Sequence, residues 1–221
     1  MLITVTGMHR EAVLFPKGGG ELLVSGGNNS GLAAMVEAAI ARGGRAVISV
    51  GICGGLAPGL KIGTAVIATE VIWRDERIPT DERWREALAT RLPRAVSGSV
   101  AGTDSIVTEP AAKAALHSGT GAAAIDMETH IAARVAADHR LPFAALRVIS
   151  DAATDTLPPA VLHAIGPDGK VRHAAMLRAI AVQPTQIPAL IRTGRNSDRA
   201  MKTLLRCFDL LGIGCGCPYL G

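Results

Sequence analysis

The sequence predicts a single α/β domain in which helices flank a central sheet. Short apolar runs alternate along the chain with segments of helical periodicity, a pattern typical of strands connected by helices. The chain has 25 glycines and only 3% aromatic residues, which suits an aliphatic core beneath tight turns. Its 221 residues fit one compact unit, and no Ser/Pro-rich linker divides them. We therefore expect one domain over residues 1–221.

In the first half of the chain, apolar runs predict the strands in order: residues 1–6, 21–25, 46–50, 64–72 and 97–102. Residues 17–20 predict a hairpin turn, and the loop at 26–31 opens a helix that continues through Arg42. The charged segment 74–94 contains Pro79 and predicts a surface loop followed by a helix. Thr108-Glu109-Pro110 is expected to cap a helix through His117.

The stretch from Ala122 to Ala153 predicts strand, helix, strand. Residues 122–125 are apolar, residues 129–139 carry one apolar helical face, and Pro142 stops the helix before a continuous apolar run at 143–149. Glu128 and Asp151 each follow one of these strands. Because ligands collect at the carboxyl ends of strands in open α/β sheets, we expect the two acids at one site.

The C-terminal region, residues 155–221, is basic and rich in proline. Between Lys170 and Arg206 there are eight basic residues and the single acid Asp198, and prolines at 167, 184 and 188 suggest broken amphipathic helices. A solvated basic face is one interpretation. A peripheral surface for anionic lipid headgroups, or for an apolar substrate, is the other.

Composition excludes several classes of protein. The net charge is only +4, and too few aromatic residues are present for base stacking, so no nucleic-acid partner is expected. No stretch approaches the roughly 18 apolar residues that span a bilayer, and no signal-peptide pattern is seen, so we expect a cytoplasmic protein. The four cysteines are expected as reduced thiols. Cys215 and Cys217 lack an accompanying His, so no metal site is expected.

Three turns could contact a ligand. The turn at 7–11 carries Arg10 and Glu11, which could hold an anion or activate water, or could be only a solvated turn. The Gly/Asn/Ser loop at 26–31 precedes a helix and so offers backbone N–H groups to an anion, although such loops also serve merely as caps. Glycines at 51, 54 and 55 allow a ligand to approach the backbone, or simply permit a tight turn.

Three motifs in order resemble the nucleoside phosphorylase and nucleosidase superfamily: VGICGGLAPGLKIG at 50–63, DMET at 126–129, and a strand that ends in Ser150-Asp151. The resemblance covers roughly residues 1–155 and implies a three-layer fold with a central mixed, twisted sheet. The subgroup it is most similar to is the phosphorylase associated with hopanoid biosynthesis, which removes adenine from adenosylhopane. The resemblance to the superfamily also implies a homo-oligomer, because its members complete the pocket with a side chain from a neighbouring subunit.

The resemblance implies roles that agree with the chemistry. Cleavage of a C–N glycosidic bond leaves positive charge on the sugar and negative charge on the base. Asp151, beside Ser150, would protonate purine N7, and Glu128 would accept hydrogen bonds from the ribose 2′- and 3′-hydroxyls. Met127 would pack against the sugar. Further substrate contacts are expected from Met8, Cys53, Gly54 and Asp126.

The nucleophile is left open between phosphate and water. MHREAV at 8–13 resembles the nucleosidase turn in which a Glu matching Glu11 activates water. Hexameric phosphorylases have Arg and Ser where this chain has Ser49 and Ile52, so the usual phosphate site is altered. Arg10 with Gly27, Asn28 and Asn29 would form another cradle. We expect phosphorolysis with inorganic phosphate as co-substrate and no other cofactor. The alternatives are a hydrolytic nucleosidase of the methylthioadenosine/S-adenosylhomocysteine type and a nonenzymatic nucleoside sensor.

Overall fold

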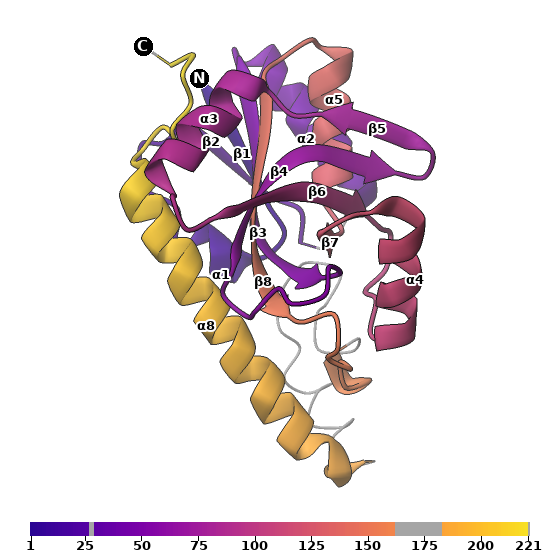
Figure 1. Ribbon diagram of the computed structural model, residues 1–221. Coiled ribbons are helices and arrows are strands. Elements are labelled where there is room, and N and C mark those ends of the chain that lie inside the picture. Colours follow the sequence, from indigo (N-terminus) through magenta and orange to yellow (C-terminus); the bar gives the residue numbers. More distant parts are fainter. Residues whose placement is uncertain (27–28, 162–182, 221) are drawn as a thin grey trace.

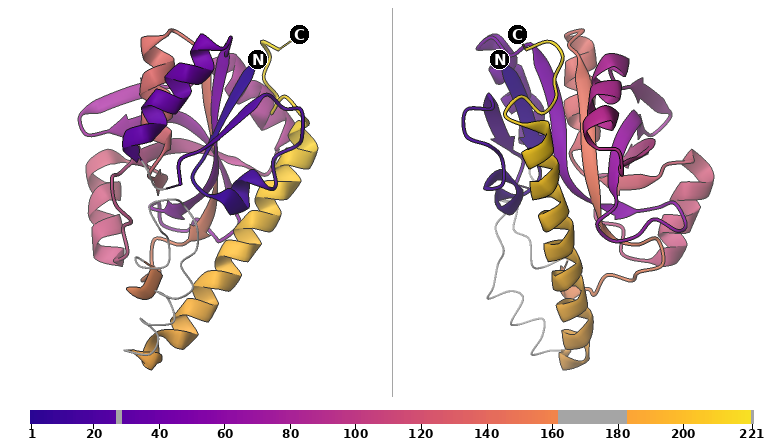
Figure 2. Two further views of the ribbon diagram at one scale, coloured as in Figure 1. Left: turned by 180° about the vertical axis from the view of Figure 1, so that it is seen from behind. Right: turned by 60° about the vertical axis from the view of Figure 1, so that its left-hand side comes forward.

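The computed structural model describes residues 1–26, 29–161 and 183–220, and it shows three layers. Helices α2 (Asn29–Ala41) and α5 (Thr129–Asp138) pack on one face of a central mixed sheet. Helices α3 (Glu82–Arg91) and α8 (Ile187–Leu211) pack on the other (Figures 1 and 2). The predicted three-layer α/β fold is therefore confirmed.

The sheet is partly open and partly closed. At its open edge β1 (Leu2–Thr6) lies parallel to both β2 (Glu21–Val24) and β3 (Ala46–Gly55). Beyond β3, β8 (Phe143–Asp151) runs parallel to β3 and antiparallel to β4 (Ala65–Trp73).

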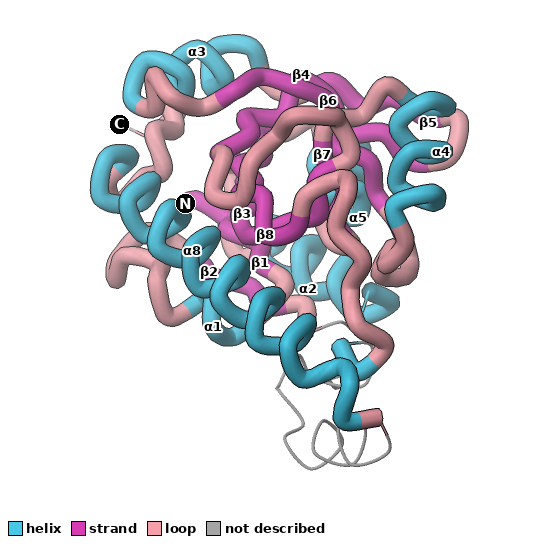
Figure 3. The backbone as a smooth tube through the Cα atoms, turned by 60° about the horizontal axis from the view of Figure 1, so that its bottom comes forward, coloured by secondary structure: helices cyan, strands magenta, loops and turns pink. Residues whose placement is uncertain are grey.

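Two further strands close this part of the sheet on itself. Strand β6 (Val96–Gly102) is parallel to β4 and to β7 (Ala124–Asp126), and β7 pairs antiparallel with the end of β3. Strands β3, β8, β4, β6 and β7 thus form a ring, which is visible in Figure 3. The short helices α1 (His9–Ala12) and α4 (Pro110–Thr120) follow β1 and β6.

The two cores are aliphatic, as the composition suggests. Ile3 and Val47 belong to the core beneath α2 and α5, while Leu204 and Phe208 of α8 belong to the core on the opposite face. The fully buried Trp84 of α3 donates its indole N–H to the carbonyl of Cys215 at 3.0 Å, so the segment after α8 is tied to the domain.

Several local predictions are wrong. β1 and β2 pair in parallel, so residues 17–20 do not form a hairpin. β3 continues through its glycines to Gly55, because partner strands on both sides satisfy the backbone there. The segment expected as surface loop contains a strand, β5 (Glu76–Pro79), on the edge of β4.

The C-terminal helix is longer than the proline pattern suggests. Pro184 lies in a short 3-10 turn, and Pro188 lies in the first turn of α8, where its missing N–H costs no helical hydrogen bond. α8 then runs for 25 residues without a break. The predicted break at Pro167 lies outside the described residues. No helix within the described ranges is long and apolar enough to cross a membrane.

This topology gathers chain turns at one edge of the sheet. β1, β3 and β8 are parallel, so their carboxyl ends meet at that edge, and the end of β7 reaches it through its pairing with β3. The residues that follow these strands are therefore close together although they come from distant parts of the sequence.

Candidate active site

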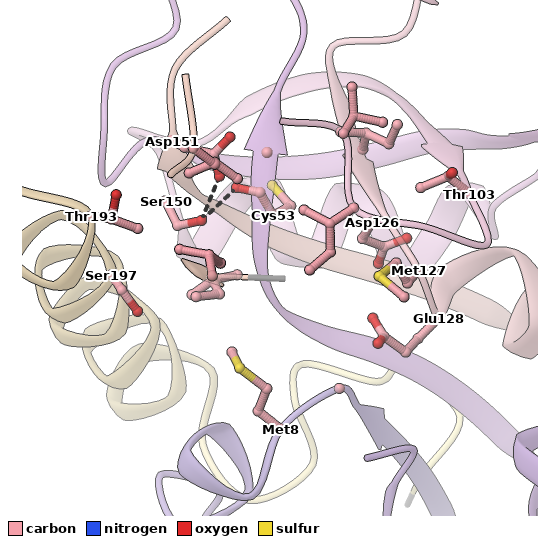
Figure 4. Close-up of a pocket in the computed structure, with 18 of the residues that line it drawn as sticks. Met8, Cys53, Thr103, Asp126, Met127, Glu128, Ser150, Asp151, Thr193 and Ser197 are labelled. Carbon is pink, nitrogen blue, oxygen red and sulfur yellow. Dashed lines mark hydrogen bonds between the residues drawn. The ribbon is translucent and has the colours of Figure 1, made fainter. Parts of the chain in front are cut away.

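A pocket of about 240 Å³ lies at this edge and contains four carboxylates. Glu11 follows β1, Asp126 ends β7, Glu128 precedes α5 and Asp151 ends β8. Figure 4 shows Asp151 with Ser150 on one side of the pocket and Glu128 with Met127 on the other, with Cys53 between them. The predicted meeting of the two acids in one cavity is therefore observed.

Glu128 has no ion-pair partner among the described residues. Its carboxylate accepts a hydrogen bond from Ser25 Oγ at 3.3 Å and packs so closely on Gly7 that a Cβ there would lie 2.8 Å from Oε1. Burial, together with the charges of Asp126 and Glu11, raises the pKa of Glu128 to about 7. Near neutral pH this carboxyl can therefore exist in either protonation state.

Asp151 has a different environment. Its Oδ2 accepts a hydrogen bond from Lys113 Nζ at 2.5 Å, and Ser150 Oγ lies 3.0 Å from Oδ1. Lys113 belongs to α4 and is fully buried. Burial raises the pKa of Asp151 above its usual range, while Lys113 and Ser150 oppose that rise.

Glu11 is held rigidly by three donors. Thr6 Oγ1 and the backbone N–H of Met8 donate to Oε2 at 2.5 and 2.8 Å, and the backbone N–H of Ile52 donates to Oε1 at 2.8 Å. The residue is 3% exposed. The turn that sequence left open as a solvated loop therefore buries its carboxylate in the pocket wall.

Asp126 forms the centre of a buried network with Arg147 of β8. The two side chains form an ion pair, and Arg147 also donates to Thr129 Oγ1 and to Ser49 Oγ at 2.5 Å. Asp126 in turn accepts from the backbone N–H of Thr129 at 3.2 Å, at the start of α5. One nitrogen, Arg147 Nη1, has no partner in the described part of the chain.

That unpartnered nitrogen faces Glu11 across Gly51. A Cβ at Gly51 would lie 2.5 Å from Arg147 Nη1 and 2.6 Å from Glu11 Oε1, so the two side chains crowd the backbone here and only glycine fits.

The remaining predicted site residues divide into two groups. Met8, Cys53 and Gly54 line the pocket, and burial raises the pKa of the Cys53 thiol well above its usual value, so that it stays neutral. Arg10 does not line the pocket; its guanidinium lies 2.9 Å from Asp198 of α8, and both side chains are exposed. Gly27 and Asn28 lie outside the described residues, and Asn29 begins α2.

Sequence reasoning missed several residues of the site. Lys113 reads as an ordinary charge on a helix, and its partner Asp151 is 38 residues away. Arg147 is the one charge within the apolar run at 143–149, and a lone charge in a buried strand is a usable signal of a buried ion pair. Thr193 and Ser197 bring α8 into the pocket wall.

The lining of the pocket has a marked charge imbalance. Over the described residues it contains the four acids and no Lys or Arg, the rest being apolar, hydroxyl, thiol or glycine groups. The same part of the chain holds no cluster of three or more His, Cys, Asp or Glu side chains suited to a metal ion. The arrangement can accept hydrogen bonds and donate protons from carboxyl groups.

Fold and pocket together define an α/β protein with a small-molecule site at the carboxyl ends of its strands. A family model described as Phosphorylase superfamily matches residues 3–181. The chain belongs to that superfamily. No match is found among curated proteins.

Solved structures with the same fold include two hydrolases. Futalosine hydrolase of Helicobacter pylori has a TM-score of 0.60 at 18% identity, covering 93% of this chain and 97% of that one. The 5′-methylthioadenosine/S-adenosylhomocysteine nucleosidase of Campylobacter jejuni has a TM-score of 0.59 at 20% identity, with 93% and 98% covered.

A third structure holds a ligand. It is a methylthioadenosine/S-adenosylhomocysteine nucleosidase of Colwellia psychrerythraea in complex with adenine, with a TM-score of 0.62 at 17% identity, covering 93% of this chain and 94% of that one. At these identities the likeness shows the fold.

The buried ion pair gives a stability prediction. Replacing Arg147 with Met leaves Asp126 buried without its counterion, so we expect the free energy of unfolding to fall by about 3–5 kcal/mol. Urea denaturation measures the change, and Arg10→Met, which breaks an exposed ion pair, is the control and should change little. Equal stability of Arg147→Met and the wild type would contradict the prediction.

Proposed function

We propose that this protein hydrolyses the N-glycosidic bond of an adenine nucleoside. The observation that carries the proposal is the position of Glu128 and Asp151 on opposite sides of one pocket, where one can hold the sugar and the other can meet the base. Membership of the superfamily supports cleavage of this bond. Structures of similar fold are described as nucleosidases, one of them with adenine bound.

The two acids assist opposite ends of the reacting bond. Ionised Glu128 accepts hydrogen bonds from the ribose hydroxyls and stabilises the positive charge that grows on the sugar, while Met127 covers the ring. Protonated Asp151 donates its proton to purine N7 and neutralises the departing base. Burial raises the pKa of Asp151, which is the direction that favours its protonated form.

Glu11 is proposed as the base that activates water. Glu11 lines the pocket, and its Oε1, which accepts one hydrogen bond from the backbone N–H of Ile52, can accept a second one from a water molecule beside the sugar. The three donors to Glu11 hold the carboxylate in one orientation. Such preorganisation makes the removal of a proton from water efficient.

Water is favoured over phosphate by electrostatics. A phosphate dianion would enter a pocket with four carboxylates and no lining cation among the described residues, which is unfavourable in a partly buried site. Arg10, the guanidinium expected to bind phosphate, pairs instead with Asp198. We therefore propose hydrolysis in place of the phosphorolysis that the resemblance to the hopanoid-associated subgroup implies.

The product assay tests the reaction class. Incubation with adenosine, methylthioadenosine or adenosylhopane in phosphate-free buffer should release adenine and free sugar, at a rate that added phosphate does not raise. Glu11→Gln should lower the rate by about 10²-fold or more. Formation of a sugar 1-phosphate would instead identify a phosphorylase. A folded protein that releases no adenine from any of the three would favour a nucleoside sensor.

The pKa of Glu128 gives a pH prediction. Below pH 7 this carboxyl is protonated and accepts the ribose hydroxyls poorly, so kcat/KM should rise with pH through an apparent pKa of about 7. In Glu128→Gln this rising limb should disappear along with most of the activity. Glu82→Gln, at an exposed acid of α3, is the control. A rising limb that persists in Glu128→Gln would assign it to another group.

We also propose that the outer face of α8 docks on anionic lipid. Five exposed cations recur at spacings of 3 and 4 residues and therefore form one stripe along the helix: Arg192, Arg195, Arg199, Lys202 and Arg206. Exposed apolar side chains, among them Ile191 and Leu205, flank the stripe. A row of cations with apolar neighbours complements a lipid surface, at about 1 kcal/mol per cation.

Vesicle binding tests this surface. The protein should co-sediment with vesicles that contain phosphatidylserine, and the bound fraction should fall as salt rises. Arg195→Glu with Lys202→Glu should abolish binding, whereas Arg45→Glu, at an exposed position before β3, should have little effect. Binding that is equal on neutral vesicles, or that is insensitive to the double substitution, would refute lipid docking.

A further inference from the structure

A fully buried lysine outside the predicted site contacts the proposed catalytic acid. Lys113 lies on α4, a helix that packs beside the pocket and presents mainly small side chains around it. A lysine is rarely buried without a partner, because moving its charge out of water is unfavourable. The environment of its ammonium group therefore calls for an explanation.

All three ammonium protons of Lys113 have acceptors. Nζ donates to Asp151 Oδ2 at 2.5 Å, to the carbonyl of Ala152 at 2.9 Å and to the carbonyl of Asp155 at 3.0 Å. Its orientation is thus fixed, and its one ionic partner among the described residues is Asp151. Within the described ranges the opposite carboxylate oxygen, Oδ1, has Ser150 as its partner, and it keeps acceptor capacity for a ligand atom.

We propose that Lys113 is a positioning residue for the reaction: it orients Asp151 and stabilises the carboxylate that proton donation leaves behind. The inference rests on the proposed function. In the balanced step, the C1′–N9 bond breaks with its electron pair going to the purine, and the Asp151 proton passes to N7. Water adds its oxygen to C1′ and gives its proton to Glu11. Asp151 is then an anion 2.5 Å from a cation.

The charge of Lys113 has two opposing effects on Asp151 as an acid. A nearby cation makes Asp151 release its proton more readily, which speeds donation, but it also reduces the fraction that is protonated at a given pH. In the part of the chain that the structure describes, Asp155 also raises the pKa of Asp151, and the neutral thiol of Cys53 on β3 lines the same pocket. Removal of Lys113 should therefore weaken the acid and keep it protonated to higher pH.

The pH profile of Lys113→Met tests the proposal. Methionine fills the buried site without a charge, so we expect kcat to fall by about 10²-fold. The limb of the profile that falls as Asp151 loses its proton should move to higher pH. Lys113→Arg keeps the cation and should leave the limb near its wild-type position. A limb that does not move in Lys113→Met, whatever the loss of kcat, would overturn the proposal and leave Lys113 a structural role.

Two further variants complete the experiment. Asp155→Asn disturbs the same turn, where Asp155 accepts the backbone N–H of Ala152 at 2.9 Å, yet it keeps the cation; its limb should stay or move to lower pH. If Lys113→Met does not fold, Lys113→Gln provides the uncharged comparison. Asp151→Asn separates the two hypotheses: near-normal turnover would refute the acid assignment itself, whereas severe loss with an unmoved limb in Lys113→Met would refute only the role of Lys113.

Discussion

The structure depends on four carboxylates that converge on one small pocket, three of them buried and Glu128 half-buried. Parallel strands end at a common edge, so acids that follow them converge, and their mutual repulsion must be offset within the fold. The four acids differ in the groups that stabilise their negative charge. Asp126 is paired with Arg147, Asp151 with Lys113, and Glu11 with three hydrogen-bond donors. Glu128 accepts a hydrogen bond from Ser25, and its pKa is raised to about 7. Sequence-distant cations are therefore as much a part of the site as the acids.

Local sequence patterns predicted most of the elements because strands buried on both faces consist of apolar runs. The apolar runs became β1, β4, β6 and β8 within a residue or two. The errors lie where tertiary contacts override local signals. Glycines that suggest a turn continue β3 because β7 and β8 pair with them, and a charged segment forms β5 because β4 offers an open edge. Pro188 begins α8, since the first turn tolerates proline.

The candidate site could be predicted only to the extent that topology dictates it. Glu128 and Asp151 follow strands, so the rule for strand ends brought them together without knowledge of the fold. Lys113 and Arg10 illustrate the limit. Each reads as an exposed helical or loop charge, but α4 buries Lys113 against Asp151, whereas Arg10 reaches Asp198, 188 residues further along the chain, outside the pocket. Which charge is buried depends on how helices pack, and no local pattern encodes that.

The charges of the four acids also bear on whether phosphate or water is the nucleophile. Two buried cations, Arg147 and Lys113, are paired with carboxylates of the site. The described lining of the pocket contains no further Lys or Arg that could bind a dianion. Water brings no charge into the pocket. It needs a proton acceptor, and we propose the carboxylate of Glu11 in the pocket wall for that role. The distribution of buried charge thus supports the proposal of water as the nucleophile, alongside the proposed roles of Asp151 as acid and Glu128 as sugar anchor.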